Sequence, residues 1–206
     1  MSITSTEPSE GINLLEAAGL QVLRDTDNPM VRAEAMRVAR RLRLTGRRVF
    51  GFTPVDDLTA VPPVLIRLGV AMMELAGSTV AYLDANTSWP ALPADLIPQS
   101  QKEDTSHFVT RWLLDSFAFL VPREKTRAVD AVPQLERVLT DGVEIFEHVL
   151  VDLTGFDRLG ELDGAIRLMD QVILVARSGG IRERTLLDLQ ARIGKDRILG
   201  TLLIGK

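Results

Sequence analysis

The sequence predicts an α/β fold: a doubly wound, mostly parallel sheet in a three-layer sandwich. Apolar runs of strand length alternate with segments of helical spacing through most of the 206 residues. Strands covered on both faces have such uninterrupted apolar runs, and the segments between them are long enough for crossover helices. The chain is 46% hydrophobic, which agrees with one sizeable core. We expect a single domain over residues 28–206, preceded by a flexible tip and a short helix in residues 1–27.

The elements of this domain follow from local patterning. Helical periodicity predicts helices over residues 12–23, 31–44, 63–76, 106–115, 129–146, 160–169 and 181–193. Apolar runs predict strands over residues 49–53, 79–84, 117–121, 148–153, 171–177 and 197–204. The proline-rich, polar stretch 87–105 is predicted to be a surface loop. In such sheets the carboxyl ends of the strands meet at one edge, so residues 53–59, 84–88, 152–157 and 177–180 should converge there.

Residues 49–86 have the strand, loop, helix and strand of a phosphate-binding P-loop unit. A working P-loop supplies glycines whose amides surround phosphate, a lysine that neutralises charge and a hydroxyl that holds magnesium. The loop here contains no glycine and no lysine, but it carries Asp56 and Asp57. Pro62 and Pro63 also remove amide donors at the start of the helix, although prolines are ordinary at helix starts. We expect this loop to repel ATP.

The helix before the first core strand is rich in arginine. It holds Arg32, Arg37, Arg40, Arg41 and Arg43, and Arg47 and Arg48 follow it. A solvated helix face explains such a run. An interface is the alternative, with the guanidinium groups bound to carboxylates of a neighbouring subunit or to anionic lipid.

Composition excludes several other classes. A net charge of -4 gives no support to general nucleic-acid binding, and the absence of cysteine excludes disulfides and cysteine metal sites. The N-terminus lacks a signal-peptide pattern and no apolar run reaches membrane-spanning length. We therefore expect a cytoplasmic protein whose membrane association goes through a partner. The spacing of His107 and His148 matches no metal site, and we predict no catalytic or metal-binding residue.

Four strand ends and one helix carry a resemblance to a known family. The strand ends read Val-Phe-Gly-Phe-Thr, Val-Ala-Tyr-Leu-Asp-Ala-Asn, His-Val-Leu-Val-Asp-Leu-Thr and Val-Ile-Leu-Val-Ala-Arg-Ser-Gly. In this order they resemble the bacterial tyrosine kinases (BY-kinases) of polysaccharide export, which are relatives of the deviant-Walker P-loop ATPases. Glu34, Arg37 and Arg40 are similar to the family's Glu-x-x-Arg-x-x-Arg element, which implies self-association into a homo-oligomer.

The departures from the family concern its nucleotide site. The family's Walker A lysine falls near Val61 or Pro62, and the hydroxyl after it near Pro62 or Pro63. The second acidic motif is Asp84-Ala85-Asn86, with one carboxylate fewer, whereas Asp152 matches the Walker B aspartate. Asp84 and Asp152 are therefore predicted to be vestigial, and Asp152 can equally be a strand-end cap. Tyr82 is the only tyrosine of the 206 residues, so we expect no tyrosine-rich tail like that of the family, and Tyr82 is predicted to lie in the core.

The resemblance, taken with these departures, implies a catalytically inactive relative without nucleotide or metal cofactor. Its partner would be the cytoplasmic end of a membrane polysaccharide co-polymerase, in a system that makes or exports capsule, exopolysaccharide or adhesin. Two alternatives stay open. One is an ATP-binding tyrosine kinase or ATPase that places Asp84 and Asp152 on magnesium at a non-standard site. The other is an adaptor of the type that positions septa or chromosomes.

Overall fold

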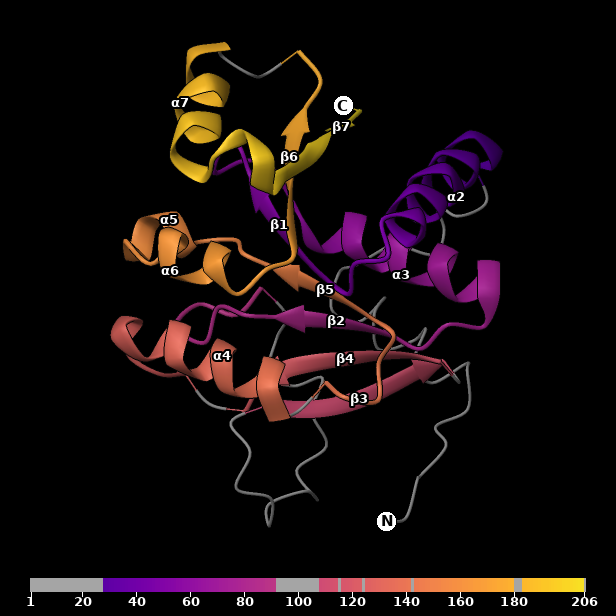
Figure 1. Ribbon diagram of the computed structural model, residues 1–206, viewed down its shortest axis with the longest axis horizontal. Coiled ribbons are helices and arrows are strands. Elements are labelled where there is room, and N and C mark those ends of the chain that lie inside the picture. The colour runs from indigo at the N-terminus through magenta and orange to yellow at the C-terminus, as the bar shows by residue number, and fades with distance from the viewer. Residues whose placement is uncertain are drawn as a thin grey trace.

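The computed structural model describes residues 28–91, 108–114, 116–123, 125–141, 143–179 and 183–205. The predicted N-terminal tip and helix, most of the predicted loop 87–105, and His107 lie outside the described residues. The remainder forms one twisted sheet with helices on both faces (Figure 1). No helix in this part of the chain is both long and apolar enough to cross a membrane.

The sheet has seven strands in the order β3-β4-β2-β5-β1-β6-β7. The strands are β1 (Val49–Pro54), β2 (Val80–Asp84), β3 (Phe108–Leu114), β4 (Phe117–Pro122), β5 (His148–Asp152), β6 (Gln171–Arg177) and β7 (Ile198–Ile204). Every neighbouring pair is parallel except β3 and β4. The predicted mostly parallel, doubly wound α/β sheet is therefore confirmed.

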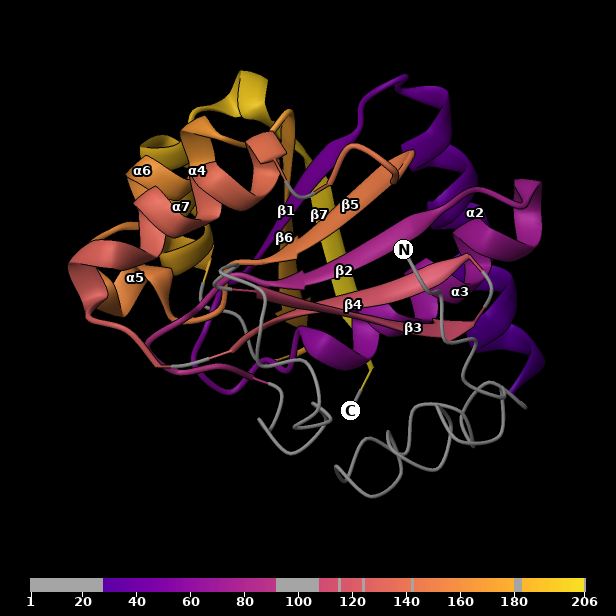
Figure 2. The same cartoon turned by 90° about the horizontal axis from the view of Figure 1, so that it is seen from below.

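The helices divide between the two faces of the sheet (Figure 2). On one face lie α2 (Pro29–Leu44) and α3 (Pro62–Ala76), and on the other α4 (Ala131–Asp141), α5 (Phe156–Leu159), α6 (Leu162–Arg167) and α7 (Glu183–Ile193). Each face has its own buried apolar cluster. Phe50, Leu65 and Tyr82 belong to the cluster under α2 and α3. Leu135 and Val149 belong to the cluster on the opposite face.

The prediction of a helix over residues 106–115 was wrong, because residues 108–114 form strand β3. Helical periodicity was misleading in a segment whose Phe, Val, Thr and Trp side chains also favour strands. The connection decides the pairing, since β3 ends at Leu114 and β4 begins at Phe117. A link this short permits an antiparallel hairpin, whereas a parallel partner requires a long crossover. The helix predicted over residues 129–146 is also shorter, and α4 ends at Asp141.

Candidate functional site

The carboxyl ends of the central strands converge as predicted. Backbone pairing between β1 and β6 continues into the loop, where the Val55 amide donates to the Val175 carbonyl at 2.8 Å. The side-chain amide of Asn86, after β2, donates to the Thr154 carbonyl, after β5, at 2.9 Å. Of the predicted strand-end residues, only Gly180 lies outside the described part of the chain. These strand ends form the candidate site.

Asp84 and Asp152 lie side by side at the ends of β2 and β5, where they are register partners. Each is only 1% exposed. One carboxylate oxygen of Asp152 accepts hydrogen bonds from the amide and the hydroxyl of Thr154, at 2.9 and 2.5 Å. The other accepts the Tyr82 hydroxyl at 3.2 Å. Asp152 therefore caps its strand end, and the predicted core position of Tyr82 is confirmed.

Burial dominates the protonation of this cluster. It raises the pKa of Asp152 above its ordinary value, although the hydrogen bonds from Thr154 and Tyr82 act in the opposite direction. Burial also raises the pKa of Tyr82, and the neighbouring carboxylates of Asp152 and Asp84 raise it further. The Tyr82 phenol consequently stays neutral and serves as a hydrogen-bond donor.

By the sequence resemblance, Asn86 stands where the family's second acidic motif has a carboxylate. Both the oxygen and the nitrogen of its side-chain amide form hydrogen bonds. Its oxygen accepts the backbone amides of Ser88 and Trp89 at 3.2 and 3.0 Å, while its nitrogen donates to Thr154. A carboxylate cannot make that donation. Gly155 makes room for the amide, because a Cβ there would lie 2.3 Å from the Asn86 nitrogen. Asn86 thus holds two loops together rather than presenting an oxygen to a metal.

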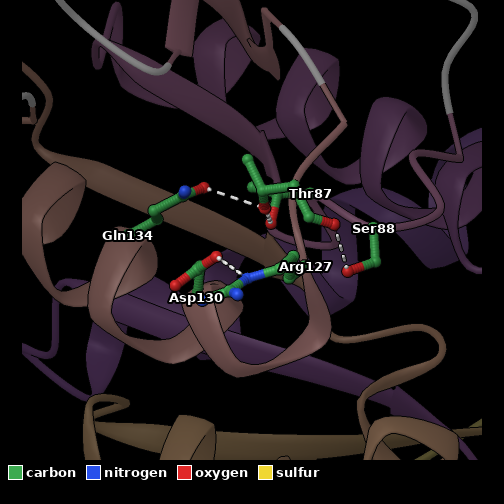
Figure 3. A network of polar contacts seen from close by, with 6 residues as sticks. Thr87, Ser88, Arg127, Asp130 and Gln134 are labelled. Carbon is green, nitrogen blue, oxygen red and sulfur yellow. Dashed lines mark hydrogen bonds and ion pairs between the residues drawn. The ribbon is translucent and has the colours of Figure 1, made fainter.

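A second polar network fixes the loop after β2 to the segment that precedes α4 (Figure 3). The Thr126 amide donates to the Thr87 carbonyl at 3.0 Å, and the two threonine hydroxyls are 2.6 Å apart. The Ser88 hydroxyl donates to the Thr126 carbonyl at 3.0 Å, and the Thr126 hydroxyl lies 3.4 Å from the Gln134 side chain. Because these polar groups bind one another, they hold the loop after β2 against the segment before α4, which is a structural role.

The loop after β1 is folded around its first carboxylate. One Asp56 oxygen accepts the Leu58 amide and the Thr59 hydroxyl, both at 2.9 Å. The other lies 3.7 Å from the Arg177 guanidinium at the end of β6. Partial burial raises the pKa of Asp56, but the hydrogen bonds and Arg177 outweigh it, so that this pKa is lowered overall. The charged Asp56 side chain therefore holds the loop in its conformation through these contacts.

The second loop carboxylate makes a two-pronged ion pair. The Arg158 guanidinium, in α5, contacts the two Asp57 oxygens at 3.0 and 2.7 Å. Both side chains are exposed, and the carboxylate raises the pKa of Arg158. Sequence reasoning placed Asp56, Asp57 and Arg177 at the converging strand ends, but it missed Arg158. The pairing of Arg177 with Asp56 was not predicted, and no local pattern points to Arg158 as the partner of Asp57.

The first turn of α3 offers no free amide to an anion. Pro62 and Pro63 have no amide hydrogen, and the amides of Val64 and Leu65 donate to the Val61 carbonyl at 3.0 and 3.2 Å. Val61 itself is fully buried in the core cluster under α3. The first turn therefore lacks the free amides with which helices hold phosphate.

The described residues do not fit a magnesium nucleotide. Two carboxylates stand at the loop, the first turn of α3 has no free amide, and neither Val61 nor Pro62, near which the family's lysine is expected, carries a positive charge. The described segments also contain no cluster of three or more histidine, aspartate or glutamate side chains able to hold a metal ion. Phosphoryl transfer needs a lysine, free backbone amides and a metal ion to position the phosphates and neutralise their charge.

The predicted self-association residues lie on the exposed side of α2. Arg37 forms an ion pair with Glu34 one turn earlier, and both are exposed. Arg40 is exposed as well. Arg32, in contrast, reaches across to Glu74 of α3 at 3.0 Å. Self-association through Glu34, Arg37 and Arg40 remains a prediction.

The comparisons with known proteins agree with this fold. No protein-family model matches the sequence, and no curated protein matches it. The structure is similar to the BceF tyrosine kinase domain, with a TM-score of 0.67 and 16% identity, over 98% of this chain and 90% of that one. It is similar to the VpsO kinase domain, with a TM-score of 0.66 and 12% identity, over 98% of this chain and 100% of that one.

A third solved structure extends the likeness. The kinase domain of the Escherichia coli tyrosine kinase ETK matches with a TM-score of 0.65 and 16% identity, over 87% of this chain and 78% of that one. At identities this low, the structural similarity establishes the fold alone. The resemblance seen in the sequence points to the same group of proteins. The chain thus has the P-loop NTPase-like α/β fold of the bacterial tyrosine kinase domains.

Proposed function

We propose that this chain is a catalytically inactive BY-kinase-like protein that acts as a cytoplasmic partner of a membrane polysaccharide complex. It would dock on the cytoplasmic end of a co-polymerase and regulate the synthesis or export of a capsule, exopolysaccharide or adhesin. The proposal combines the fold with the resemblance of four strand ends and one helix to that family. The observation that carries it is the first turn of α3, where two prolines and internal hydrogen bonds leave no amide of that turn free for phosphate.

Electrostatics support the loss of catalysis. A transferring phosphate needs positive groups and free amides around it. In this loop the nearest charged groups are Asp56 and Asp57, and the positive charges of Arg177 and Arg158 are directed at those carboxylates. A nucleotide would have to break both ion pairs and would still meet neither a lysine nor free amides of the first turn of α3. The protein therefore acts through its surfaces.

Self-association through α2 is the mechanism we assign to those surfaces. Glu34 and Arg37 are exposed and paired within one helix, so the same charges can exchange partners with those of a neighbouring subunit. Arg40 adds a second guanidinium on the same exposed side. An exposed ion pair contributes little to the stability of one chain, so little is lost when it is exchanged.

Isothermal titration with ATP and ADP, with and without magnesium and up to millimolar nucleotide, tests the inactive site. We expect no binding heat from protein whose circular dichroism shows that it is folded. Binding at micromolar concentration would overturn the proposal and favour the kinase or ATPase alternative.

Complementation tests the cellular role. Deleting the gene in its bacterium should reduce polymer on the cell surface, and an Asp152→Asn variant should restore it because no catalysis is lost. A variant with both Arg37→Ala and Arg40→Ala should fail to restore polymer and should show a lower molecular mass than wild type by light scattering, because the contacts through α2 are lost. Normal polymer with misplaced septa or chromosomes after deletion would favour the positioning adaptor.

A further inference from the structure

Strand β7 is the last strand of the sheet and has an open side. It pairs in parallel with β6, and no strand of the described segments lies on its other side. Its seven residues, Ile-Leu-Gly-Thr-Leu-Leu-Ile, include no charged residue and no proline. Natural proteins usually protect an exposed edge with charges, prolines or irregularities, because unpaired backbone groups recruit other strands.

The other edge of the sheet is better protected. β3 carries Arg111 in its middle and a register irregularity between Trp112 and Leu114. β7 has one irregularity near its start, opposite Val172 and Ile173, but its pairing with β6 is regular from Gly200 to Ile204. The unprotected edge is therefore the second half of β7.

The backbone groups on this open edge can be assigned. The Ile204 carbonyl accepts a hydrogen bond from the Ser178 amide, so it faces the β6 side. Successive residues of a strand direct their amide and carbonyl groups to alternate sides. Thr201 and Leu203 therefore direct theirs away from β6, toward the open edge.

The sequence of β7 is nearly symmetrical about Thr201. Leu199 and Leu203 are equidistant from it, as are Ile198 and Ile204. Two antiparallel copies centred on Thr201 would place leucine opposite leucine, isoleucine opposite isoleucine and threonine opposite threonine. Such pairs stabilise sheets, and a two-fold axis brings identical residues together in this way.

We propose that β7 pairs with β7 of a second copy of this chain, antiparallel and centred on Thr201, so that two sheets become one. The side chains also favour this occupant. Leu203 is 65% exposed, while Leu202 and Ile204 are only partly covered. Pairing would cover these apolar groups, and no charge on the strand opposes it. This interface is separate from α2 and does not depend on the proposed function.

A cysteine placed at the centre of the pairing provides a direct test, because the chain has no cysteine of its own. Directly opposed residues in a hydrogen-bonded antiparallel pair have Cα atoms about 5.5 Å apart, within reach of a disulfide. Thr201→Cys should therefore form a covalent dimer under mild oxidation. Leu203→Cys is the matched control, because its two copies would be displaced by about 13 Å along the strands. Equal crosslinking of the two variants would refute the register.

A charge on the same edge should separate the copies. Thr201 is exposed, so Thr201→Lys should leave the fold intact while placing two like charges opposite each other. We expect wild type to sediment as a dimer of the 22.7 kDa chain and Thr201→Lys to dissociate roughly tenfold more readily or worse. A monomeric wild type at 100 μM, roughly the range of weak homodimers, would overturn the proposal. So would a Thr201→Lys dimer as stable as wild type. If only Arg37→Ala with Arg40→Ala separates the copies, α2 alone carries the association.

Discussion

Two pairs of carboxylates at the same end of the sheet have opposite environments. Asp84 and Asp152 are buried, and Asp152 is held by Thr154 and Tyr82. Asp56 and Asp57 belong to a surface loop and are balanced by arginines. The buried pair is part of the core, whereas the loop pair lies at the surface and forms ion pairs that fix the conformation of the loop. The same strand ends can therefore stay in place beside a loop whose carboxylates are held by arginines.

The largest effect should come from Tyr82, whose ring is fully buried and packs edge-on against Phe119 at 5.2 Å. Tyr82→Ala should reduce the free energy of unfolding by about 3–5 kcal/mol, as for other large core truncations. Tyr82→Phe is the control, because it removes only the hydroxyl and should lose about 1 kcal/mol. Urea denaturation measures both. Equal losses from the two variants would show that the ring packing contributes little.

Removal of the Asp152 carboxylate should have the next largest effect. Asp152→Ala leaves the Thr154 amide, the Thr154 hydroxyl and the Tyr82 hydroxyl without their acceptor, which should lower the free energy of unfolding by about 1–3 kcal/mol. Asp152→Asn keeps a carbonyl oxygen for Thr154 and should lose less. The same urea experiment decides, and a larger loss for the asparagine variant would contradict this account.

The pH dependence of Asp152 sharpens the contrast with the loop. Burial raises its pKa above 3.8, so the folded protein binds this proton more tightly than the unfolded chain. The protonated Asp152 therefore stabilises the folded state fully at pH values below the pKa of the unfolded chain. This contribution is lost as pH rises through the pKa of Asp152 in the folded protein. The free energy of unfolding of wild type should therefore fall relative to Asp152→Asn as pH rises from 3.8 toward neutrality. A constant difference between the two proteins would contradict the raised pKa.

The smallest effect should come from the exposed pair. Arg158→Ala removes the partner of Asp57, but both groups are already solvated. The urea midpoint should match that of wild type, measured beside Asp152→Ala as the buried counterpart. A clear shift would mean that the loop contributes to folding after all.

The sequence predicted the parts of the fold that depend on local patterning. The apolar runs located β1, β2, β5 and β6, and their alternation with helices predicted the parallel sheet. It failed at residues 106–115, where strand pairing across a short connection decides the structure. The ion pair between Asp57 and Arg158 joins residues 101 positions apart, which no local pattern reveals. The proximity of Asp84 and Asp152 followed from strand ends, but their link through Tyr82 required the strand register.

Under the proposed function, the position of Val61 would make the loss of phosphate binding difficult to reverse. Its side chain belongs to the same buried cluster as Phe50 and Phe52, and its backbone carbonyl accepts the first hydrogen bonds of α3. A lysine introduced here would enter the apolar interior instead of the loop, with a heavy desolvation penalty. Glycine at residues 62 and 63 would restore two amides while leaving that position blocked. An evolutionary return to nucleotide binding would first have to move the beginning of a helix, a change that no single substitution makes.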